Sequence, residues 1–331
     1  MKELKNDIKN KSFRRAYLLF GAERYLVEHY ARSIASAVLD ENGMLMNRDV
    51  FEGGEVAAEN ITDAANTLPF LSETRVVLVR DSGLFAFGRK NESDAMADYV
   101  QDIPDTTILI FTETEVDKRN RLYKKISSAG RAVQCDKPSE GDLIVWVGNV
   151  FKKKGKTIGR ENSIRLLRLV MQNMTALSKE ADKLDGYTGD RKEITEDDIK
   201  AVCSPSLETR VFDLVGDAAS GRVESALRNY SMMIAMKESP VMILTLIARQ
   251  FRMILLCKDA LRKGKSSSAV ARELGLHGFV ADEYISQSRR FTREKILSAV
   301  FDCQETDVKI KTGLIGAETG VELLIIKYAA S

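Results

Sequence analysis

Short apolar runs alternate with helical stretches in the first part of the chain, and this alternation constrains the fold more than any other feature. Separate helices between such runs are typical of a mostly parallel sheet that is covered on both faces. The candidate strands are Ala16–Phe20, Arg75–Val79, Thr107–Thr112 and Ala132–Cys135, and the helical stretches lie near Tyr25–Val38, Ala57–Thr67, Ser93–Val100 and Lys118–Ser127. We therefore predict an α/β domain over residues 1–138, ending where Pro138 breaks the pattern.

Strand patterns disappear after Pro138, and helix signals replace them. Ser139 and Asp142 fit a capping box, in which each residue caps the backbone at the other. An amphipathic stripe with helical spacing follows at Leu143, Trp146, Val147 and Val150. Thr195 and Asp198 indicate a second helix start, and "CSPSLE" ends this region. We predict a small helical domain over residues 139–206.

The remaining residues, 207–331, are also predicted to be helical and to contain no strand. Ser239 before Pro240 is typical of a helix N-cap followed by proline in the first turn. The long helix that starts there should run towards Arg262, where "GKSSS" interrupts it. Further helices are expected near 280–288, 293–309 and 318–329.

The stretch "AYLLFGAERYLVEHY" passes from an apolar run through Gly21 into a helix, which is where a phosphate-binding loop would begin. A working loop reads GxxxxGK[ST], where lysine neutralises phosphate charge and the hydroxyl helps to hold magnesium. Counting from Gly21, these positions hold Leu26 for the second glycine, Val27 for the lysine and Glu28 for the hydroxyl. We interpret Gly21 as a residue that lets the chain turn, and we expect no nucleotide cofactor.

The run "TTILIFTETE" occupies the place of the acidic pair that binds magnesium in such folds, but it carries Thr112 before Glu113. A single carboxylate is a weak signal, so we interpret Glu113 as a solvated loop acid.

Composition excludes several other classes. Fifty basic and 48 acidic residues give a net charge of +2, which is not the strong positive charge of a protein that lives on DNA. The four cysteines form no CxxC pair, and with only His29 and His277 a zinc site is not expected. The N-terminus does not resemble a signal peptide, and no apolar run approaches the length of a membrane span. We expect a cytoplasmic protein with reduced thiols.

Several stretches, in order along the chain, together resemble one family, the delta subunit of the bacterial DNA polymerase III clamp loader. "YLLFGAERYLVE" resembles its degenerate first strand and helix, and "NTLPFLSETRVVLVRD" resembles its clamp-contacting element. "DKRNRLYKKI" resembles its basic helix, and its last domain is matched by "ETRVFDLVGDAASG", "LIARQFRMIL" and "DVKIKTG".

This resemblance implies an AAA+-like fold with a degenerate phosphate loop, followed by a collar. Residues 1–138 would form the clamp-binding α/β domain, 139–206 the helical lid and 207–331 the all-α collar through which the subunit oligomerises. The implied role is to bind the ring-shaped sliding clamp, the beta subunit, and to hold one of its interfaces open without hydrolysing ATP. Implied partners are loader subunits of the tau/gamma and delta prime type, and primed DNA. The subunit itself would be no enzyme, although the holoenzyme is a DNA-directed DNA polymerase, which is a transferase.

The motif places the clamp contacts at Leu68, Phe70 and Leu71. Pro69 stands where some members carry an aliphatic residue, so the motif leaves open which apolar side chains enter the clamp pocket. Core packing at a helix end is the alternative for Leu68 and Phe70. A second candidate site, for DNA phosphates, is the basic run of Lys118, Arg119, Arg121, Lys124 and Lys125. A solvated helix face is the commoner meaning of such a run.

Two other functions stay open at this point. An active AAA+ motor or helicase loader would conflict with Leu26, Val27 and Glu28, and nucleotide binding would distinguish it. A DNA-binding helical protein with a vestigial first domain would conflict with the near-neutral charge. Co-purification with a ring-shaped clamp would distinguish that class from a clamp-loader subunit.

Overall fold

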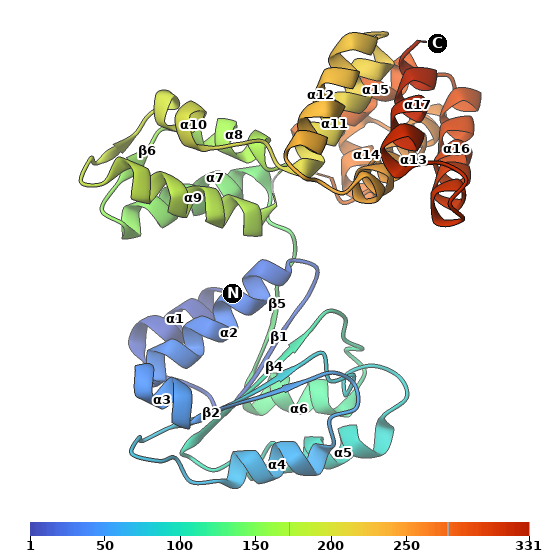
Figure 1. The fold of residues 1–331 in the computed structure, drawn as a ribbon. Coiled ribbons are helices and arrows are strands. Elements are labelled where there is room, and N and C mark those ends of the chain that lie inside the picture. Colours follow the sequence, from blue (N-terminus) through green and yellow to red (C-terminus); the bar gives the residue numbers. More distant parts are fainter. Residues whose placement is uncertain (172, 277, 331) are drawn as a thin grey trace. The chain divides into compact units, whose positions relative to one another are not determined.

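The computed structural model describes residues 1–171, 173–276 and 278–330. His277 lies outside the described residues. The chain forms two compact units, Met1–Lys137 and Pro138–Ser331, which we describe separately (Figure 1).

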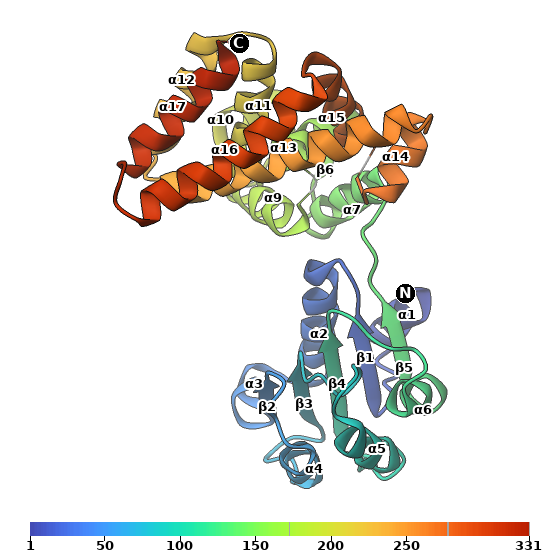
Figure 2. The same cartoon turned by 90° about the vertical axis from the view of Figure 1, so that its right-hand side faces the viewer.

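A parallel five-stranded sheet in the order β2-β3-β4-β1-β5 organises the first unit (Figure 2). Its strands are β1 (Ala16–Phe20), β2 (Arg48–Glu52), β3 (Arg75–Arg80), β4 (Thr107–Glu113) and β5 (Arg131–Gln134). One face is covered by α1 (Lys2–Asn10), α2 (Arg24–Val38) and α3 (Glu41–Met46). The other face is covered by α4 (Ala58–Asn66), α5 (Lys90–Tyr99) and α6 (Arg121–Ala129). The predicted α/β fold with a parallel sheet is confirmed.

Burial explains which strands the sequence revealed. All residues of β1 and β4 are buried, because helices cover both faces of these central strands. Strand β2 was missed. It lies at the edge of the sheet, and in its sequence, RDVFE, exposed and half-buried residues alternate. An edge strand of this kind needs no continuous apolar run, so the sequence pattern did not indicate β2.

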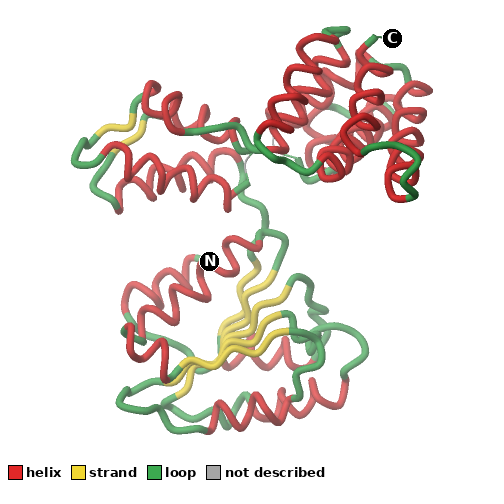
Figure 3. Tube along the Cα trace, in the orientation of Figure 1, coloured by secondary structure: helices red, strands yellow, loops and turns green. Residues whose placement is uncertain are grey.

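The first part of the second unit is helical, apart from one short strand pair (Figure 3). Its helices are α7 (Glu140–Lys153), α8 (Arg160–Leu169), α9 (Met174–Thr188) and α10 (Glu196–Val202). The capping boxes at Ser139 and Thr195 are both present, as predicted. The prediction that no strand follows residue 138 is wrong, because β6 (Thr157–Ile158) pairs in parallel with β7 (Glu193–Ile194). Strands of two residues are too short to leave a periodic pattern.

The rest of the second unit is all helical, as predicted. It consists of α11 (Leu207–Ala219), α12 (Val223–Ala235), α13 (Pro240–Arg262), α14 (Ser267–Glu273), α15 (Gly278–Arg290), α16 (Arg293–Lys311) and α17 (Ala317–Ala329). Helix α13 contributes buried side chains such as Ile243, Phe251 and Ile254 to one core shared by these helices. The division of the second unit at residue 206 stays a prediction.

Helix α13 has 23 residues and contains an 18-residue stretch with a mean hydropathy of 1.6, so length and composition alone would let it cross a membrane. This is weak evidence, because the core helix of a soluble protein passes the same test. In this structure 39% of that stretch is buried, and its buried side chains belong to the core that these helices share.

Candidate functional site

The degenerate phosphate loop and the predicted clamp-contacting segment lie at opposite edges of the sheet of the first unit. Parallel strands all point the same way, so residues that follow the strands gather at one edge and residues that precede them gather at the other. The turn after β1 at Gly21 and the end of β4 at Glu113 belong to the carboxyl edge. The segment 67–74, which contains Leu68, Phe70 and Leu71, precedes β3 and so belongs to the amino edge.

Gly21 makes the turn between β1 and α2 with a backbone φ of 128°. A Cβ atom at this position would lie 2.6 Å from the Cys135 carbonyl oxygen, so close packing as well as conformation requires glycine. The Gly21 N–H donates to the Glu113 carbonyl at 3.2 Å, and the Glu23 N–H donates to the Cys135 carbonyl at 3.0 Å. The turn is therefore fastened to the strands on both sides of β1.

The amide groups that would cradle a phosphate are engaged within the protein. The Glu23 carboxylate caps α2 by accepting from the Tyr25 N–H at 3.2 Å. The Leu26 and Val27 N–H groups donate to the Glu23 carbonyl at 3.1 and 3.2 Å. Burial raises the pKa of the Glu23 carboxyl. A carboxylate of the chain thus occupies the helix N-terminus where a phosphate would bind.

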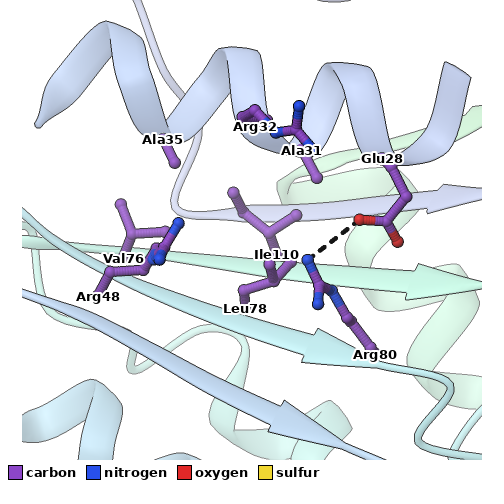
Figure 4. Close-up of a pocket in the computed structure, with 9 residues that line it drawn as sticks. All are labelled: Glu28, Ala31, Arg32, Ala35, Arg48, Val76, Leu78, Arg80 and Ile110. Atoms are coloured by element: carbon purple, nitrogen blue, oxygen red, sulfur yellow. Dashed lines mark hydrogen bonds and ion pairs between the residues drawn. The ribbon is translucent and has the colours of Figure 1, made fainter. Parts of the chain in front are cut away.

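The three altered motif positions carry two buried apolar side chains and one carboxylate in an ion pair. Leu26 and Val27 are buried. Glu28 forms an ion pair with Arg80 at 3.1 Å, which Figure 4 shows beneath α2, and lies 3.6 Å from Arg24. Two apolar side chains and a negative charge therefore stand where a working loop has glycine, lysine and a hydroxyl.

The interpretation of Glu113 as a solvated loop acid is wrong. Its side chain is 4 % exposed, and it accepts hydrogen bonds from the Ser82 N–H at 2.9 Å and the Ser82 hydroxyl at 2.6 Å. Burial raises its pKa. Glu113 is the last residue of β4, and the neighbouring strand β3 ends two residues before Ser82, so the sheet brings the two together.

The three side chains that the motif predicts to contact the clamp are exposed to solvent. Leu68 is 77 % exposed, Phe70 59 % and Leu71 93 %. Helix α4 ends at Asn66, and Pro69 follows three residues later in an irregular connection to β3. Leu71 adopts a left-handed backbone with φ of 49°, which is unusual for a residue other than glycine. We call residues 67–72 the apolar loop.

Asn47 holds this loop in place, and the sequence analysis missed it. Its side-chain Oδ1 accepts from the Phe70 N–H at 2.6 Å, and its Nδ2 donates to the Phe70 carbonyl at 2.8 Å. Asn47 is only 1 % exposed. A buried amide that satisfies both backbone groups of one residue fixes the path of the loop. Because the contact joins residues 23 positions apart, no local pattern could have indicated it.

The predicted basic run divides into paired and unpaired charges. Arg119 forms an ion pair with Asp117 at 3.0 Å, and Arg121 forms one with Asp98. Lys118 donates to the Gln134 side chain at 2.7 Å. Lys124 and Lys125 form no salt bridge within the described part of the chain. Among the described residues, Lys118, Lys124 and Lys125 therefore keep a charge that no acidic side chain neutralises.

These features define a class of protein: an AAA+-like fold whose phosphate loop has lost the side chains that bind nucleotide. Residues 17–136 match the family model for the DNA polymerase III delta subunit, and residues 208–328 match the model for its C-terminal domain. The chain belongs to the DNA polymerase III delta subunit family, as the sequence resemblance predicted.

Individual relatives agree with the family models. The chain is 27% identical over 318 residues to DNA polymerase III subunit delta of Bacillus subtilis (strain 168), which covers 94% of this chain and 92% of that protein. It is 23% identical over 303 residues to an Aquifex aeolicus (strain VF5) protein named "Probable DNA polymerase III subunit delta", covering 88% and 85%. Among solved structures, the DNA clamp loader delta protein of Bacillus subtilis matches with a TM-score of 0.77 and 26% identity, covering 100% of this chain and 99% of that one.

Proposed function

We propose that this clamp-loader subunit binds the sliding clamp through Leu68, Phe70 and Leu71. It then holds one interface of the ring open for loading onto primed DNA, and it does not hydrolyse ATP itself. The observation that carries the proposal is the exposure of these three apolar side chains on a loop that Asn47 fixes.

Exposed apolar side chains of this size are costly for a free protein, and they act as anchors when a partner supplies a pocket. Burying each one against the clamp contributes about 1.5–3 kcal/mol. The fixed loop adds to this, because a loop that already has its bound shape loses less conformational entropy on binding. The alternative of core packing is not supported, since Leu68 and Phe70 face solvent.

The remaining assignments concern the assembled loader. We assign assembly with tau/gamma-type and delta prime-type subunits to the collar, residues 207–331, and clamp binding to residues 1–138, with 139–206 as the lid. Direct contact with DNA phosphates is assigned to the basic run, in which Lys118, Lys124 and Lys125 form no salt bridge among the residues described. An ATP-driven motor is disfavoured because Val27 is buried and Glu28 is paired with Arg80.

The proposal is tested with the double variant Leu68→Ala with Phe70→Ala in the full chain. Losing both anchors should weaken clamp binding by about 3–6 kcal/mol, which is at least a hundredfold in Kd. Surface plasmon resonance against the clamp measures the affinity, and a thermal melt measures the fold. Since both side chains are exposed, the melting temperature should stay unchanged.

A matched control removes exposed leucine and phenylalanine side chains elsewhere, in Phe301→Ala with Leu314→Ala. This control should keep full clamp affinity. Unchanged affinity in the loop variant would refute the proposal, and a lowered melting temperature would show that the loop belongs to the core.

A further inference from the structure

Helix α3 exposes two of its three large apolar side chains, and the third, Met44, is half-buried. In this helix, Glu41–Met46, the large apolar side chains of Leu45 and Met46 are 81 % and 62 % exposed. Gly43 is buried instead, and so is Asn47, the residue at the end of the helix. A helix that only had to pack on its own domain would turn its apolar side chains inwards.

The buried residues at α3 are Gly43, which packs closely against the residues before the helix, and Asn47, which bonds to the sheet. A Cβ atom on Gly43 would lie 3.1 Å from the Asp40 Oδ1 atom and 3.2 Å from Leu39, so little room exists for a larger side chain. The Asn47 N–H donates to the Gly43 carbonyl at 2.8 Å, and the Asn47 carbonyl accepts from Val76 on β3 at 2.8 Å. The helix is therefore held firmly while Leu45 and Met46 remain in solvent.

The same asparagine joins α3 to the apolar loop. Met46 directly precedes Asn47, and the Asn47 side chain holds both backbone groups of Phe70. The end of α3 and the backbone at Phe70 are thus connected by two hydrogen bonds. A partner that contacts Phe70 would therefore meet a second exposed apolar pair, Leu45 and Met46, which Asn47 connects to the Phe70 backbone.

We propose that Leu45 and Met46, the α3 pair, form a second part of the surface that docks on the sliding clamp. This inference rests on the proposed function and adds residues that the family motif does not contain. The occupant is an apolar surface of the clamp beside the pocket that takes the loop. Methionine suits such a contact, because its flexible thioether adapts to an irregular apolar surface.

The test replaces the pair in the full chain as Leu45→Ser with Met46→Ser. Clamp affinity measured by surface plasmon resonance should fall about tenfold or more, with an unchanged melting temperature. The matched control, Leu314→Ser with Met236→Ser, removes an exposed leucine and methionine of the second unit and should bind as wild type does.

Outcomes separate this inference from the proposed function. If Leu68→Ala with Phe70→Ala abolishes binding but the serine pair leaves it unchanged, the α3 pair is no part of the interface and only this inference fails. If the wild-type chain does not bind the clamp, both the proposed function and this inference are refuted. If sedimentation shows that the wild type dimerises and the serine pair makes it monomeric, with clamp affinity unchanged, the occupant is a second copy and the inference is overturned.

Asn47→Ala tests the connection between the two parts. It leaves the Phe70 N–H and carbonyl without their buried partner, so the loop should lose its fixed path. The Phe70 amide should then exchange its hydrogen faster, and clamp affinity should fall about tenfold although Asn47 itself is buried. Unchanged exchange at Phe70, or unchanged affinity despite faster exchange, would show that the connection does not matter for docking.

Discussion

Two buried polar side chains show how much a single residue determines in this molecule. Asn47 fixes a loop by forming hydrogen bonds with both backbone groups of Phe70. Glu113 lies at the end of β4 and joins it to the segment after β3 through Ser82. Both sit near a candidate site without being exposed to a ligand, so their roles are to position backbone. Polar groups that are buried and fully paired are well suited to such a role.

The burial of Glu113 predicts a pH dependence of stability. Because its pKa in the folded protein is raised by burial, its stabilising contribution is present in acid and is lost as the pH rises through that pKa. Glu113→Gln keeps an oxygen that can accept from Ser82 but never becomes charged. We expect the melting temperature of the variant to equal that of wild type near pH 4 and to exceed it by a few degrees near pH 7.5. A difference that is constant over this range would contradict the prediction.

At the scale of elements, the sequence predicted what depends on local pattern. Strands β1 and β4 are buried on both faces and leave apolar runs, and capping residues such as Ser139 mark helix starts. Strand β2, at the sheet edge, leaves no such run. The exposure of Phe70 could be anticipated from the family motif, whereas the hydrogen bonds with which Asn47 fixes its backbone could not. That contact joins segments that are distant in sequence and exists only once the sheet has formed.

The turn between β1 and α2 predicts the absence of useful ATP binding. Lysine and hydroxyl contacts to phosphate are worth about 1.5–3 kcal/mol each, and both side chains are replaced here. The loss of two such contacts weakens binding by about a hundredfold to ten-thousandfold. A fluorescent ATP analogue titrated with magnesium should therefore show no saturable binding in the micromolar range. An ATP-binding subunit of the loader serves as the positive control, and micromolar binding by the wild-type chain would refute the prediction.

At the scale of the whole molecule, exposed apolar side chains gather on both units. The first unit carries the apolar loop and the α3 pair, and the second carries Phe301 and Val308 on α16. These last two are seven residues apart and therefore lie on the same face of their helix. Two separate apolar surfaces on two compact units are what a subunit needs if it binds the clamp with one unit and its fellow subunits with the other.

The last prediction concerns this division of roles. Phe301→Ser with Val308→Ser should weaken assembly with the other loader subunits by at least about tenfold, because exposed apolar side chains on one helix face are typical anchors. The same variant should bind the clamp with wild-type affinity, since the proposed clamp contacts all lie in the first unit. Gel filtration with the partner subunits measures assembly, and surface plasmon resonance measures clamp binding. Leu68→Ala with Phe70→Ala should give the opposite result, with normal assembly and lost clamp binding. If the α16 variant lost both activities while keeping its melting temperature, the two surfaces would not be independent and the division of roles would be wrong.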